Sequence, residues 1–460
     1  MRKRLFGTDG VRGVVGRDLN PEMALRLGRA IGAFFGRGSR VLVGRDVRAG
    51  GDMIASAVIS GLLAEGVKVY YAGLLPTPAL QFSVRTLGYD GGVMVTASHN
   101  PPEYNGVKVI ATDGIEVDRD SEAVIEEHFY SQREPSRLEW RELAEPVETR
   151  IGLVEHYVNS IVEHVDREVI ARAGFRVVVD CGNSVGALAT PLLLRKLGAK
   201  ALSLNCHMDP EFPGREPEPT PDSLREAAAL VRESRAELGV AHDGDADRAI
   251  FIDEKGRVLW GDRSGAILAV YAASRWRDYP RVVFTGVSSS LVAEEHLRKH
   301  GIEVRWTPVG SIIIARSLKR EGGIAGFEEN GGYIHAPFQL VRDGAMATAL
   351  MLEALAREKR SLSSLAEELP EYHTIKTKIP AVGEMRECAV RAVKERYRGY
   401  RMIEVDGVKA ILDKGWVLVR PSGTEPVVRI VAEGRTKSDA EELLAEALRV
   451  IEERCLEARA

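Results

Sequence analysis

The 460-residue chain has few cysteines, few glutamines and no long apolar run. The scattered cysteines form no CxxC pair, and we predict that they are free buried thiols in a reducing cytoplasm. They are Cys181, Cys206, Cys388 and Cys455. No uninterrupted apolar stretch approaches the length of a membrane span, and Gly7, Thr8 and Asp9 stand where a signal peptide needs apolar residues. These absences predict a soluble cytoplasmic protein with no membrane partner.

An excess of positive charge is also lacking. Lysine and arginine total 63 against 67 acidic residues, a net charge of −4, which excludes a strongly basic nucleic-acid binder. A small anionic ligand stays compatible with this balance, because local arginines and lysines decide its binding. Only three glutamines (Gln81, Gln132 and Gln339) occur among many Arg and Glu, a pattern that indicates a thermophilic source.

The stretch GVMVTASHNPPEYNGVKV, residues 92–109, is where the sequence first indicates chemistry. Its first residues are small, apolar and partly β-branched, which predicts a short buried strand, and the prolines after Ser98-His99-Asn100 end the regular structure. A serine at the carboxyl end of a strand in an α/β sheet faces the crevice where ligands bind. Ser98 could therefore carry a phosphoryl group, although a loop serine is often only a turn or cap residue.

Three carboxylates at alternate positions, Asp243, Asp245 and Asp247, form a second candidate site between two apolar strand-like runs. Carboxylates this close repel each other unless a cation lies among them, and oxygen ligands suit a hard divalent ion. The alternatives are a solvated acidic turn and an EF-hand calcium loop, whose twelfth position would be Glu254. Since Arg248 stands where an EF-hand needs glycine and strands flank the loop, we favour a Mg²⁺ site.

Two basic residues of the first predicted unit could contact an anion. Arg12, in the glycine loop FGTDGVRG, offers a planar fork of donors that suits phosphate, or it is a surface arginine in a turn. Lys108, in a predicted strand over 106–110, points away from the side of Val107 and Val109. Without a partner anion it would be a solvated edge-strand lysine.

Two later glycine loops carry polar groups that suit a phosphorylated sugar. Glu328, Glu329 and Asn330 precede Gly331-Gly332 and could accept hydrogen bonds from sugar hydroxyls, unless they form a solvated acidic turn. The stretch RPSGTEPVVRI predicts a phosphate site through guanidinium, hydroxyl and backbone donors, with a plain hairpin turn as the alternative. Its candidate residues are Arg420, Ser422, Gly423, Thr424 and Arg429.

Strands alternate with helices over most of the chain, which predicts α/β units; in the first of them we expect a parallel sheet. We place unit boundaries at 1–150, 151–254, 255–370 and 371–460. The last unit differs, because it contains predicted strands over 404–408, 410–412 and 416–420 and an amphipathic helix over 438–458.

TASHNP, DGDADR, the EENGG loop and RPSGTEP, in this order, resemble the motifs of the α-D-phosphohexomutase superfamily. FGTDGVRG resembles the start of its phosphoglucosamine mutase branch. The resemblance implies four domains around a central cleft: three with a related mixed α/β sheet core, and a C-terminal α+β domain that closes over the cleft.

The resemblance also implies a role for each motif. Ser98 would be the phosphoserine and, with the three aspartates, would hold Mg²⁺ through a phosphate oxygen. The reacting centre would be lined by Arg12, His99, Lys108 and Arg248. Glu328 and Asn330 would bind the sugar hydroxyls, and the RPSGTEP loop the distal phosphate. Hexose phosphates and a hexose 1,6-bisphosphate would be the ligands.

One motif departs from the superfamily pattern, and it bears on acid–base chemistry. Many members have GEMSGH or GEQSGH where this chain has FEENGG, so the motif histidine is missing. His335, three residues on, is a candidate replacement, and Lys108 is the other candidate for proton transfer.

The resemblance implies that glucosamine phosphate is the first substrate. The alternative is that the protein acts as a phosphomannomutase or a phosphoglucomutase. A non-catalytic phosphosugar sensor is a further alternative, although a sensor needs neither a nucleophile nor a metal. The sequence leaves the number of subunits open, and a homo-oligomer is compatible with it.

Overall fold

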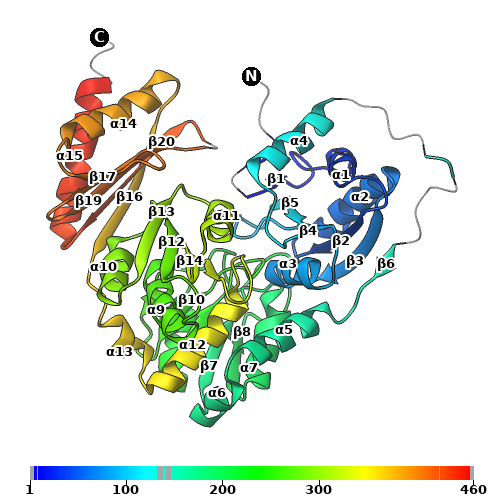
Figure 1. The fold of residues 1–460 in the computed structure, drawn as a ribbon, viewed down its shortest axis with the longest axis horizontal. Coiled ribbons are helices and arrows are strands. Elements are labelled where there is room, and N and C mark those ends of the chain that lie inside the picture. Colours follow the sequence, from blue (N-terminus) through cyan, green and yellow to red (C-terminus); the bar gives the residue numbers. More distant parts are fainter. Residues whose placement is uncertain (1–4, 8, 132–137, 141–146, 424, 456–460) are drawn as a thin grey trace.

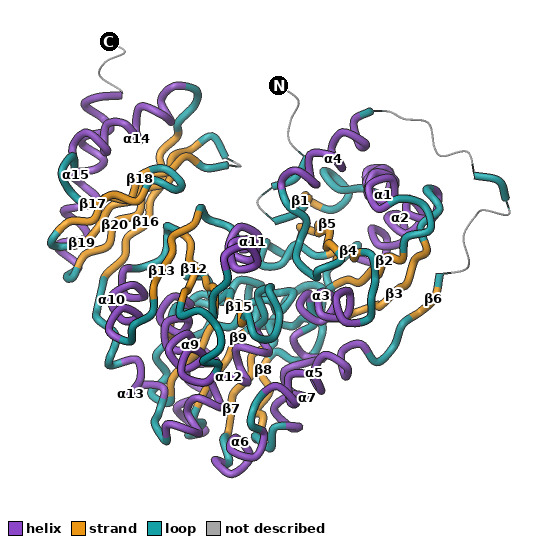
Figure 2. Tube along the Cα trace, viewed as in Figure 1, coloured by secondary structure: helices purple, strands orange, loops and turns teal. Residues whose placement is uncertain are grey.

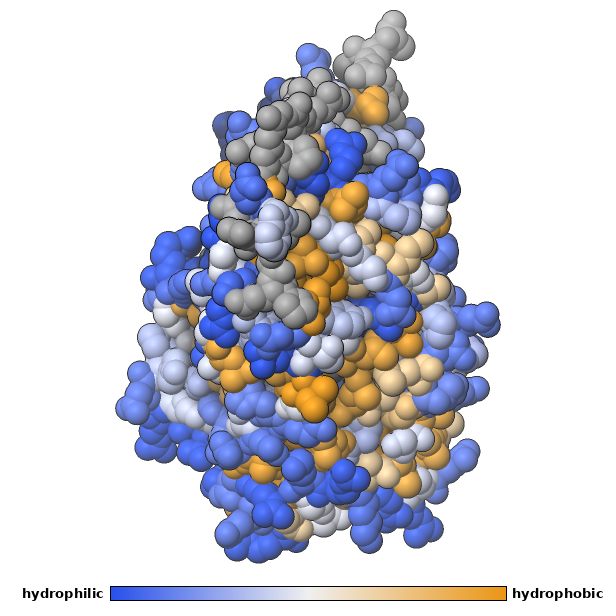
Figure 3. All heavy atoms as spheres, turned by 90° about the vertical axis from the view of Figure 1, so that its right-hand side faces the viewer, coloured by the Kyte–Doolittle hydropathy of each residue, from blue (hydrophilic) through white to orange (hydrophobic). Residues whose placement is uncertain are grey.

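The computed structural model describes residues 5–7, 9–131, 138–140, 147–423 and 425–455. These residues form four β-sheets, and we call the unit around each sheet domain I to IV in chain order. Figures 1 and 2 show domain I beside domains II and III, and domain IV next to domain III and apart from domain I. No helix among the described residues is long and apolar enough to cross a membrane. Figure 3 shows apolar patches interspersed with hydrophilic residues on the domain I side.

Domain I has a six-stranded sheet in the order β1-β5-β4-β2-β3-β6. Its strands are β1 (Val11–Val14), β2 (Arg40–Arg45), β3 (Lys68–Leu74), β4 (Gly91–Val95), β5 (Tyr104–Ala111) and β6 (Glu148–Thr149). Its helices are α1 (Pro21–Phe35), α2 (Gly51–Ala64), α3 (Thr77–Thr86) and α4 (Arg119–Tyr130). Alternate residues of β2 point to opposite faces: Val41 and Val43 share a core with α1, α2 and α4, and Leu42 packs on the side of α3.

The prediction of a parallel sheet in domain I is wrong in part. β2 pairs in parallel with β3 and β4, but β5 runs antiparallel to both β4 and β1. The physical reason is the short Ser98 loop between β4 and β5, because a parallel return needs a crossover of a dozen or more residues. The sheet is therefore mixed, and Ser98 lies in a hairpin connection.

Domains II and III also have mixed sheets, in which parallel strands are followed by an antiparallel pair. Domain II has the order β11-β10-β9-β7-β8, and domain III has the order β13-β12-β14-β15. The strands are β7 (Arg176–Asp180), β8 (Lys200–Leu204), β9 (Leu238–Ala241), β10 (Ile250–Asp253), β11 (Val258–Leu259), β12 (Val282–Gly286), β13 (Glu303–Thr307), β14 (Ala325–Phe327) and β15 (Tyr333–His335). The helices are α5 (Leu153–His164), α6 (Arg167–Ala173), α7 (Gly186–Lys196), α8 (Arg225–Ser234), α9 (Gly261–Arg275), α10 (Leu291–Lys299), α11 (Ser311–Glu321), α12 (Gly344–Glu358) and α13 (Leu362–Ala366).

Three of the candidate loops occupy equivalent places in domains I to III. The aspartate loop joins the antiparallel pair β9 and β10, and the Glu328 loop joins the antiparallel pair β14 and β15. The Ser98 loop joins β4 and β5 in the same way. One apolar core runs through all three domains and includes Leu80, Leu193 and Phe327. This shared core holds the three hairpins in fixed relation to one another.

Domain IV is an antiparallel sheet in the order β16-β20-β19-β18-β17, with two helices on one face. Its elements are β16 (His373–Pro380), α14 (Glu384–Arg396), β17 (Arg401–Ile403), β18 (Val408–Leu412), β19 (Gly415–Pro421), β20 (Val427–Gly434) and α15 (Lys437–Cys455). The strand expected over 404–408 is wrong: β17 ends at Ile403, and residues 404–407 form the turn to β18. Asp406-Gly407 is a strong turn signal, but the β-branched residues Val405 and Val408 on either side of it had suggested a strand.

The prediction that the cysteines are free thiols is also wrong. Cys181 pairs with Cys206, and Cys388 pairs with Cys455. The parallel pairing of β7 with β8 brings the first two together, since each cysteine follows the end of one strand. The other two link α14 to α15, which pack side by side in the core of domain IV. Partners 25 and 67 residues apart leave no local sequence pattern.

We expect both disulfides to raise thermal stability. A crosslink over a separation of 67 residues removes chain entropy from the unfolded state worth about 4 kcal/mol. The Cys388→Ser/Cys455→Ser double variant should therefore unfold at a lower temperature than wild type in calorimetry. Thiol titration supplies the control: the denatured, unreduced wild type should expose no thiol. Four reactive thiols in that sample would show that the pairs do not form.

Domain IV packs against domain III around a buried lysine. Lys409, in β18, is fully buried and its ammonium donates to the carbonyls of Val287 (3.1 Å) and Ser289 (2.6 Å). The nitrogen lies 4.2 Å from the ring centroid of Trp306 and 3.7 Å from that of Trp416. An apolar cluster shared by the two domains surrounds this contact. The lysine thus connects the two domains at a point outside the candidate loops.

Lys409 gives domain IV a pH-dependent stability. Burial lowers the pKa of Lys409 from 10.5 to about 7, so between those values the unfolded chain binds more protons than the folded chain. Its contribution to the free energy of unfolding therefore rises as the pH increases from 7 to 10.5, by up to about 1.4 kcal/mol per pH unit. In Lys409→Met this dependence disappears, so the stability difference between wild type and variant should change with pH.

Chemical unfolding followed from pH 6 to pH 10 measures that difference. Exposed Lys394→Met is the control, because its side chain is half exposed at the surface of the same domain. We expect the free energy of unfolding of wild type to increase relative to that of Lys409→Met as the pH rises. The difference between wild type and the control should not change with pH. A difference from Lys409→Met that is constant over the whole range would contradict the prediction.

Candidate active site

The structure brings the Ser98 loop of domain I against the aspartate loop of domain II. Ser98 is fully buried, and its hydroxyl donates a hydrogen bond of 2.7 Å to Asp243. Its φ of 51° lies in the left-handed region, which is uncommon for a residue other than glycine and shows that the surrounding structure constrains the backbone here. A β-carbon at Gly244 would lie 2.4 Å from the carbonyl oxygen of Ser98, so only glycine permits this approach.

Arg48 binds the backbone of the Ser98 loop, and the sequence analysis did not identify this arginine. The side chain is buried, and its guanidinium donates to the carbonyl oxygens of Ser98 (2.6 Å), Asn100 (2.6 Å), Pro101 (2.7 Å) and Tyr104 (3.0 Å). One guanidinium therefore fixes the backbone of the whole loop. The sequence around Arg48 carries no motif that singles out this residue.

The three aspartates form a cluster that suits a cation. Carboxylate oxygens of Asp243, Asp245 and Asp247 lie within 4.8 Å of one another, and all three residues are buried. Asp245 Oδ1 and Asp247 Oδ1 are buried without a hydrogen-bond partner among the described residues. Burial, together with repulsion from Asp247 and Asp245, raises the pKa of Asp243 to about 8. A bound cation would satisfy these oxygens and remove that repulsion, so the residues fit a metal site.

The EF-hand alternative does not fit this geometry. The strands β9 and β10 on either side of the loop pair directly with each other. Glu254, which would be the twelfth residue of a calcium loop, instead accepts hydrogen bonds from Ser363. The carboxylate is thus engaged with domain III.

Lys108 faces the aspartate cluster. β5 is an inner strand between β1 and β4, so the expectation of a solvated edge lysine is wrong, and the side chain is fully buried. Its ammonium lies 3.0 Å from Asp245 and 3.5 Å from Asp247, with Glu116 at 3.6 Å. Burial would lower the pKa of Lys108, but these carboxylates outweigh burial and raise it. The lysine therefore stays protonated.

The remaining predicted residues of the reacting centre lie around Ser98. Arg12 donates to Asp9 (2.8 Å) and to Asn100, beside the serine. His99 Nδ1 lies 2.8 Å from a guanidinium nitrogen of Arg248 and 3.4 Å from the Ser98 hydroxyl. The positive charge of Arg248, with burial, lowers the pKa of His99 to about 2, so the imidazole is neutral and accepts from the arginine. The sequence also missed Thr77, whose hydroxyl donates to Asp245 at 2.7 Å.

The Glu328 loop of domain III reaches the same centre through Arg342. Glu328 is buried and accepts a hydrogen bond of 3.0 Å from Arg342, which also donates 2.6 Å to Asp247. Asn330 accepts from the backbone N–H of Gly332, which shapes the turn. The structure thus connects two of the predicted loops by a residue that sequence analysis did not predict.

His335 lies in an aromatic cluster and contacts none of the residues around Ser98. It is buried in β15, 3.1 Å from a ring nitrogen of His164. Its ring packs edge-on against Trp276, with centroids 4.5 Å apart. Burial and His164 lower the pKa of His335, which keeps it neutral. This placement favours Lys108 as the group that transfers a proton.

The fourth predicted loop lies at the tip of the β19–β20 hairpin in domain IV. Figure 1 shows this hairpin pointing from domain IV toward domain I. Arg420 donates through Nε to Asp406 (2.9 Å), and Arg429 donates to Glu425 (2.8 Å). Ser422 is buried, and Gly423 has open space around its α-carbon. Thr424 lies outside the described residues.

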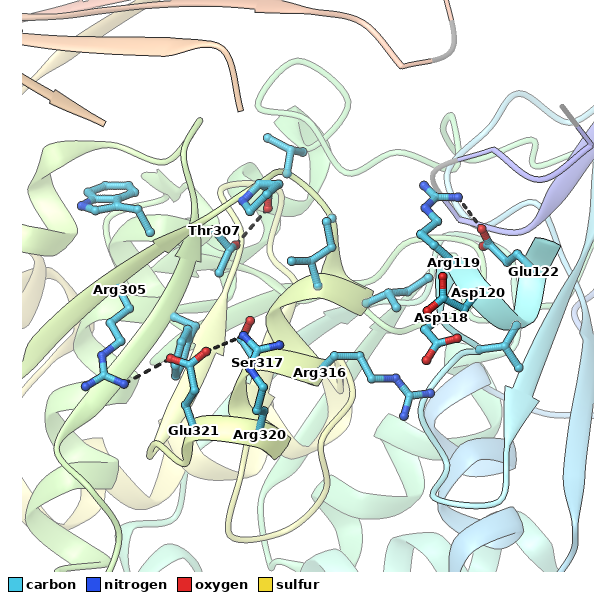
Figure 4. Close-up of a pocket in the computed structure, with 18 residues that line it drawn as sticks. Asp118, Arg119, Asp120, Glu122, Arg305, Thr307, Arg316, Ser317, Arg320 and Glu321 are labelled. Atoms are coloured by element: carbon cyan, nitrogen blue, oxygen red, sulfur yellow. Dashed lines mark hydrogen bonds and ion pairs between the residues drawn. The ribbon is translucent and has the colours of Figure 1, made fainter. Parts of the chain in front are cut away.

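A pocket of about 650 Å³ separates α4 of domain I from β13 and α11 of domain III. Figure 4 shows Asp118 and Arg119 on one side of this pocket and Arg305, Thr307 and Arg316 on the other. None of the predicted site residues lines it. It lies between domains I and III, and Val309 in its lining donates to Asp406, the carboxylate that also accepts from Arg420 of the fourth loop.

Comparison with known proteins agrees with this architecture. The sequence matches the family models "Phosphoglucomutase/phosphomannomutase, alpha/beta/alpha domain I" over residues 3–136, domain II over 155–256, domain III over 260–372 and "C-terminal domain" over 376–450. A phosphoglucosamine/phosphogalactosamine mutase of Sulfurisphaera tokodaii is 50% identical over 98% of this chain and 99% of that protein.

Two further relatives agree. A phosphoglucomutase/phosphomannomutase of Thermococcus kodakarensis is 42% identical over 98% of this chain and 99% of its own. The crystal structure of a phosphoglucomutase/phosphomannomutase family protein from Burkholderia thailandensis superposes with a TM-score of 0.85 at 25% identity, covering 99% of this chain and 98% of that one.

Fold, site and relatives together define an enzyme of the isomerase class, a mutase that moves a phosphoryl group within a hexose phosphate. The chain belongs to the phosphoglucomutase/phosphomannomutase family. The predicted superfamily, the four-domain fold with three mixed sheets and the phosphohexomutase activity are confirmed.

Proposed function

We propose that the protein interconverts hexose 6-phosphate and hexose 1-phosphate through a phosphoserine at Ser98. The phosphoserine gives its phosphoryl group to the free hydroxyl of the bound sugar phosphate: the bond from the Ser98 oxygen to phosphorus breaks, and the proton of the sugar hydroxyl ends on that serine oxygen. The resulting hexose 1,6-bisphosphate turns around and returns its other phosphoryl group to the Ser98 hydroxyl. The observation that best supports this role is the buried Ser98 hydroxyl 2.7 Å from the aspartate cluster.

Asp243, Asp245 and Asp247 would hold Mg²⁺, together with an oxygen of the phosphoserine at Ser98. The support is the donor set: carboxylate oxygens only, two of them buried and unpartnered among the described residues. When bound, the metal would supply positive charge that stabilises the transferring phosphoryl group.

Lys108 is our candidate for moving the sugar proton. Its ammonium is buried beside the aspartates, 3.0 Å from Asp245, and already carries a proton, so it would act first as an acid. It would give a proton to the Ser98 oxygen as the bond from that oxygen to phosphorus breaks, and the sugar hydroxyl would then reprotonate it. Arg12, His99 and Arg248 would orient the transferring phosphate around Ser98. Neutral His99 can donate from its second ring nitrogen while Nδ1 accepts from Arg248.

Two loops would bind the rest of the substrate. Glu328 and Asn330 would accept hydrogen bonds from sugar hydroxyls. The loop with Arg420, Ser422, Gly423, Thr424 and Arg429 would bind the phosphate that does not react, when domain IV closes. Closure would also keep water from the phosphoserine, which water would otherwise hydrolyse.

We propose glucosamine phosphate as the first substrate, because FGTDGVRG occurs at the start and the Sulfurisphaera relative carries that name. Phosphomannomutase or phosphoglucomutase activity is the second candidate, favoured by the name of the Thermococcus relative. A cytoplasmic location stays compatible with two disulfides if the source is a hyperthermophile, since such organisms keep disulfides inside the cell.

Phosphorus NMR tests the function directly. Purified protein with Mg²⁺ and a trace of the matching sugar 1,6-bisphosphate is incubated with the 6-phosphates of glucosamine, glucose and mannose in separate tubes. Formation of the 1-phosphate establishes the mutase, and the relative rates identify the substrate. If none of the three sugars reacts although the metal binds, the proposal fails for these substrates. That outcome would favour the non-catalytic phosphosugar sensor.

A further inference from the structure

Arg342 joins the functional loops of three domains. It lies between β15 and α12, and its guanidinium donates to Glu328 (3.0 Å), Asp247 (2.6 Å) and Asp9 (3.2 Å). These carboxylates belong to domain III, domain II and domain I respectively, and the arginine side chain is only 6% exposed. A planar guanidinium holds its five donors in a fixed fork and so can fix the orientation of three separate carboxylates, whereas an ammonium acts as a compact point charge.

The backbone around Arg342 is rigid, so the position of the side chain is set before any ligand binds. Ile334 pairs with Arg342 in an antiparallel bridge. The next residue, Asp343, caps α12 and accepts hydrogen bonds from Tyr157 and Gln339. A β-carbon at Gly332 would lie 2.4 Å from Cδ of Arg342, so the glycine of the sugar loop leaves room for the side chain.

The hydrogen bonds of Arg342 leave one oxygen of each key carboxylate available. Arg342 engages Oδ2 of Asp247, and Oδ1 is buried without a hydrogen-bond partner among the described residues; Nε of Arg248 lies 3.9 Å from this Oδ1. It engages Oε2 of Glu328, and Oε1 has no hydrogen bond to any residue that the structure describes. Asp247 and Asp9 outweigh the effect of burial and raise the pKa of Arg342, so the guanidinium is charged at every working pH.

Resting on the proposed function, we propose that Arg342 is a positioning residue that couples the metal site to the sugar site. It turns Oδ1 of Asp247 toward the metal and Oε1 of Glu328 toward a sugar hydroxyl, and so sets the spacing between the two. Loss of this guanidinium should weaken metal binding and sugar binding together, although Arg342 is a ligand of neither.

The test uses full-length Arg342→Met and Arg342→Lys, with Arg357→Met as the matched control. Arg357 is an arginine of α12 that also joins two domains, through Asp166 and Glu353, but it contacts no candidate loop. Direct Mn²⁺ binding by electron paramagnetic resonance and glucosamine 6-phosphate binding by calorimetry are measured beside kcat and KM. Both Arg342 variants should bind Mn²⁺ about 10-fold more weakly and turn over about 100-fold more slowly, and the control should stay within twofold.

A second variant keeps the test decisive if Arg342→Met does not fold. Gly332→Ala keeps the arginine and its charge but displaces the side chain, so it should reproduce the loss of Mn²⁺ affinity. Mn²⁺ and sugar phosphate affinities within twofold of wild type in the folded variants would overturn the inference, even if turnover fell. If wild type itself lacks mutase activity but Arg342→Lys still loses Mn²⁺ affinity, the proposed function fails and the positioning role stands.

Discussion

Ser98→Ala is expected to lower mutase turnover by about 10⁴-fold or more, because the proposed mechanism passes the phosphoryl group through this hydroxyl. Wild type exposed to hexose 1,6-bisphosphate should gain the mass of one phosphate group, and Ser98→Ala should not. Stability should change little, since the variant loses one hydrogen bond to Asp243, worth about 1 kcal/mol. Intact mass spectrometry and phosphorus NMR measure the two effects.

Ser83→Ala is the matched control for this experiment. Ser83 is equally buried in domain I, but its hydroxyl donates only to a carbonyl within its own helix, α3. We expect this variant to keep full turnover and to accept the phosphate group. Turnover by Ser98→Ala within tenfold of wild type, or a phosphate mapped to another residue, would show that Ser98 is not the carrier.

The candidate loops could be predicted from the sequence because each concentrates unusual residues in a short window. Alternating aspartates with small spacers, and a serine followed by prolines, have few structural explanations, and the structure brings both loops together at 2.7 Å. The helices were also predictable, since α1, α5 and α11 each bury one stripe of apolar residues. Local composition determined these features.

Features that depend on distant partners could not be predicted. Arg48 and Arg342 lie in ordinary loop sequence, and their roles come from carbonyls and carboxylates that other strands deliver. The burial of Lys108 depends on the strand order, because β1 returns to cover β5. Cys181 and Cys206 meet only because β7 and β8 are neighbours. In each case the missing information was topology.

The aspartate cluster and the cations around it form one electrostatic unit. Lys108 and Arg342 face the buried carboxylates of Asp245 and Asp247 and the partly buried carboxylate of Asp9. Buried charges are stable only when paired, and removal of one partner leaves the other with its full desolvation cost. The residues that would perform the chemistry therefore also hold domains I, II and III together.

Lys108→Met should consequently affect both turnover and stability. Loss of a proton-transferring group lowers turnover by roughly 10²–10⁴-fold. The carboxylates of Asp245, Asp247 and Glu116 lose their shared cation, which should destabilise the fold by about 3–5 kcal/mol. Because a divalent cation can replace part of the missing charge, Mg²⁺ should raise the melting temperature of this variant more than that of wild type.

Lys409→Met is the matched control, since both lysines are fully buried but only Lys108 lies among carboxylates of the candidate site. Lys409 instead donates to carbonyls of domain III and lies between two indole rings. We expect its variant to keep turnover within a few-fold of wild type and to show no extra stabilisation by Mg²⁺. If Lys108→Met turns over within tenfold of wild type, another group moves the proton. If it also melts like wild type with and without Mg²⁺, the charge pairing derived for the cluster is wrong, because a buried ammonium beside these carboxylates cannot be removed without consequence.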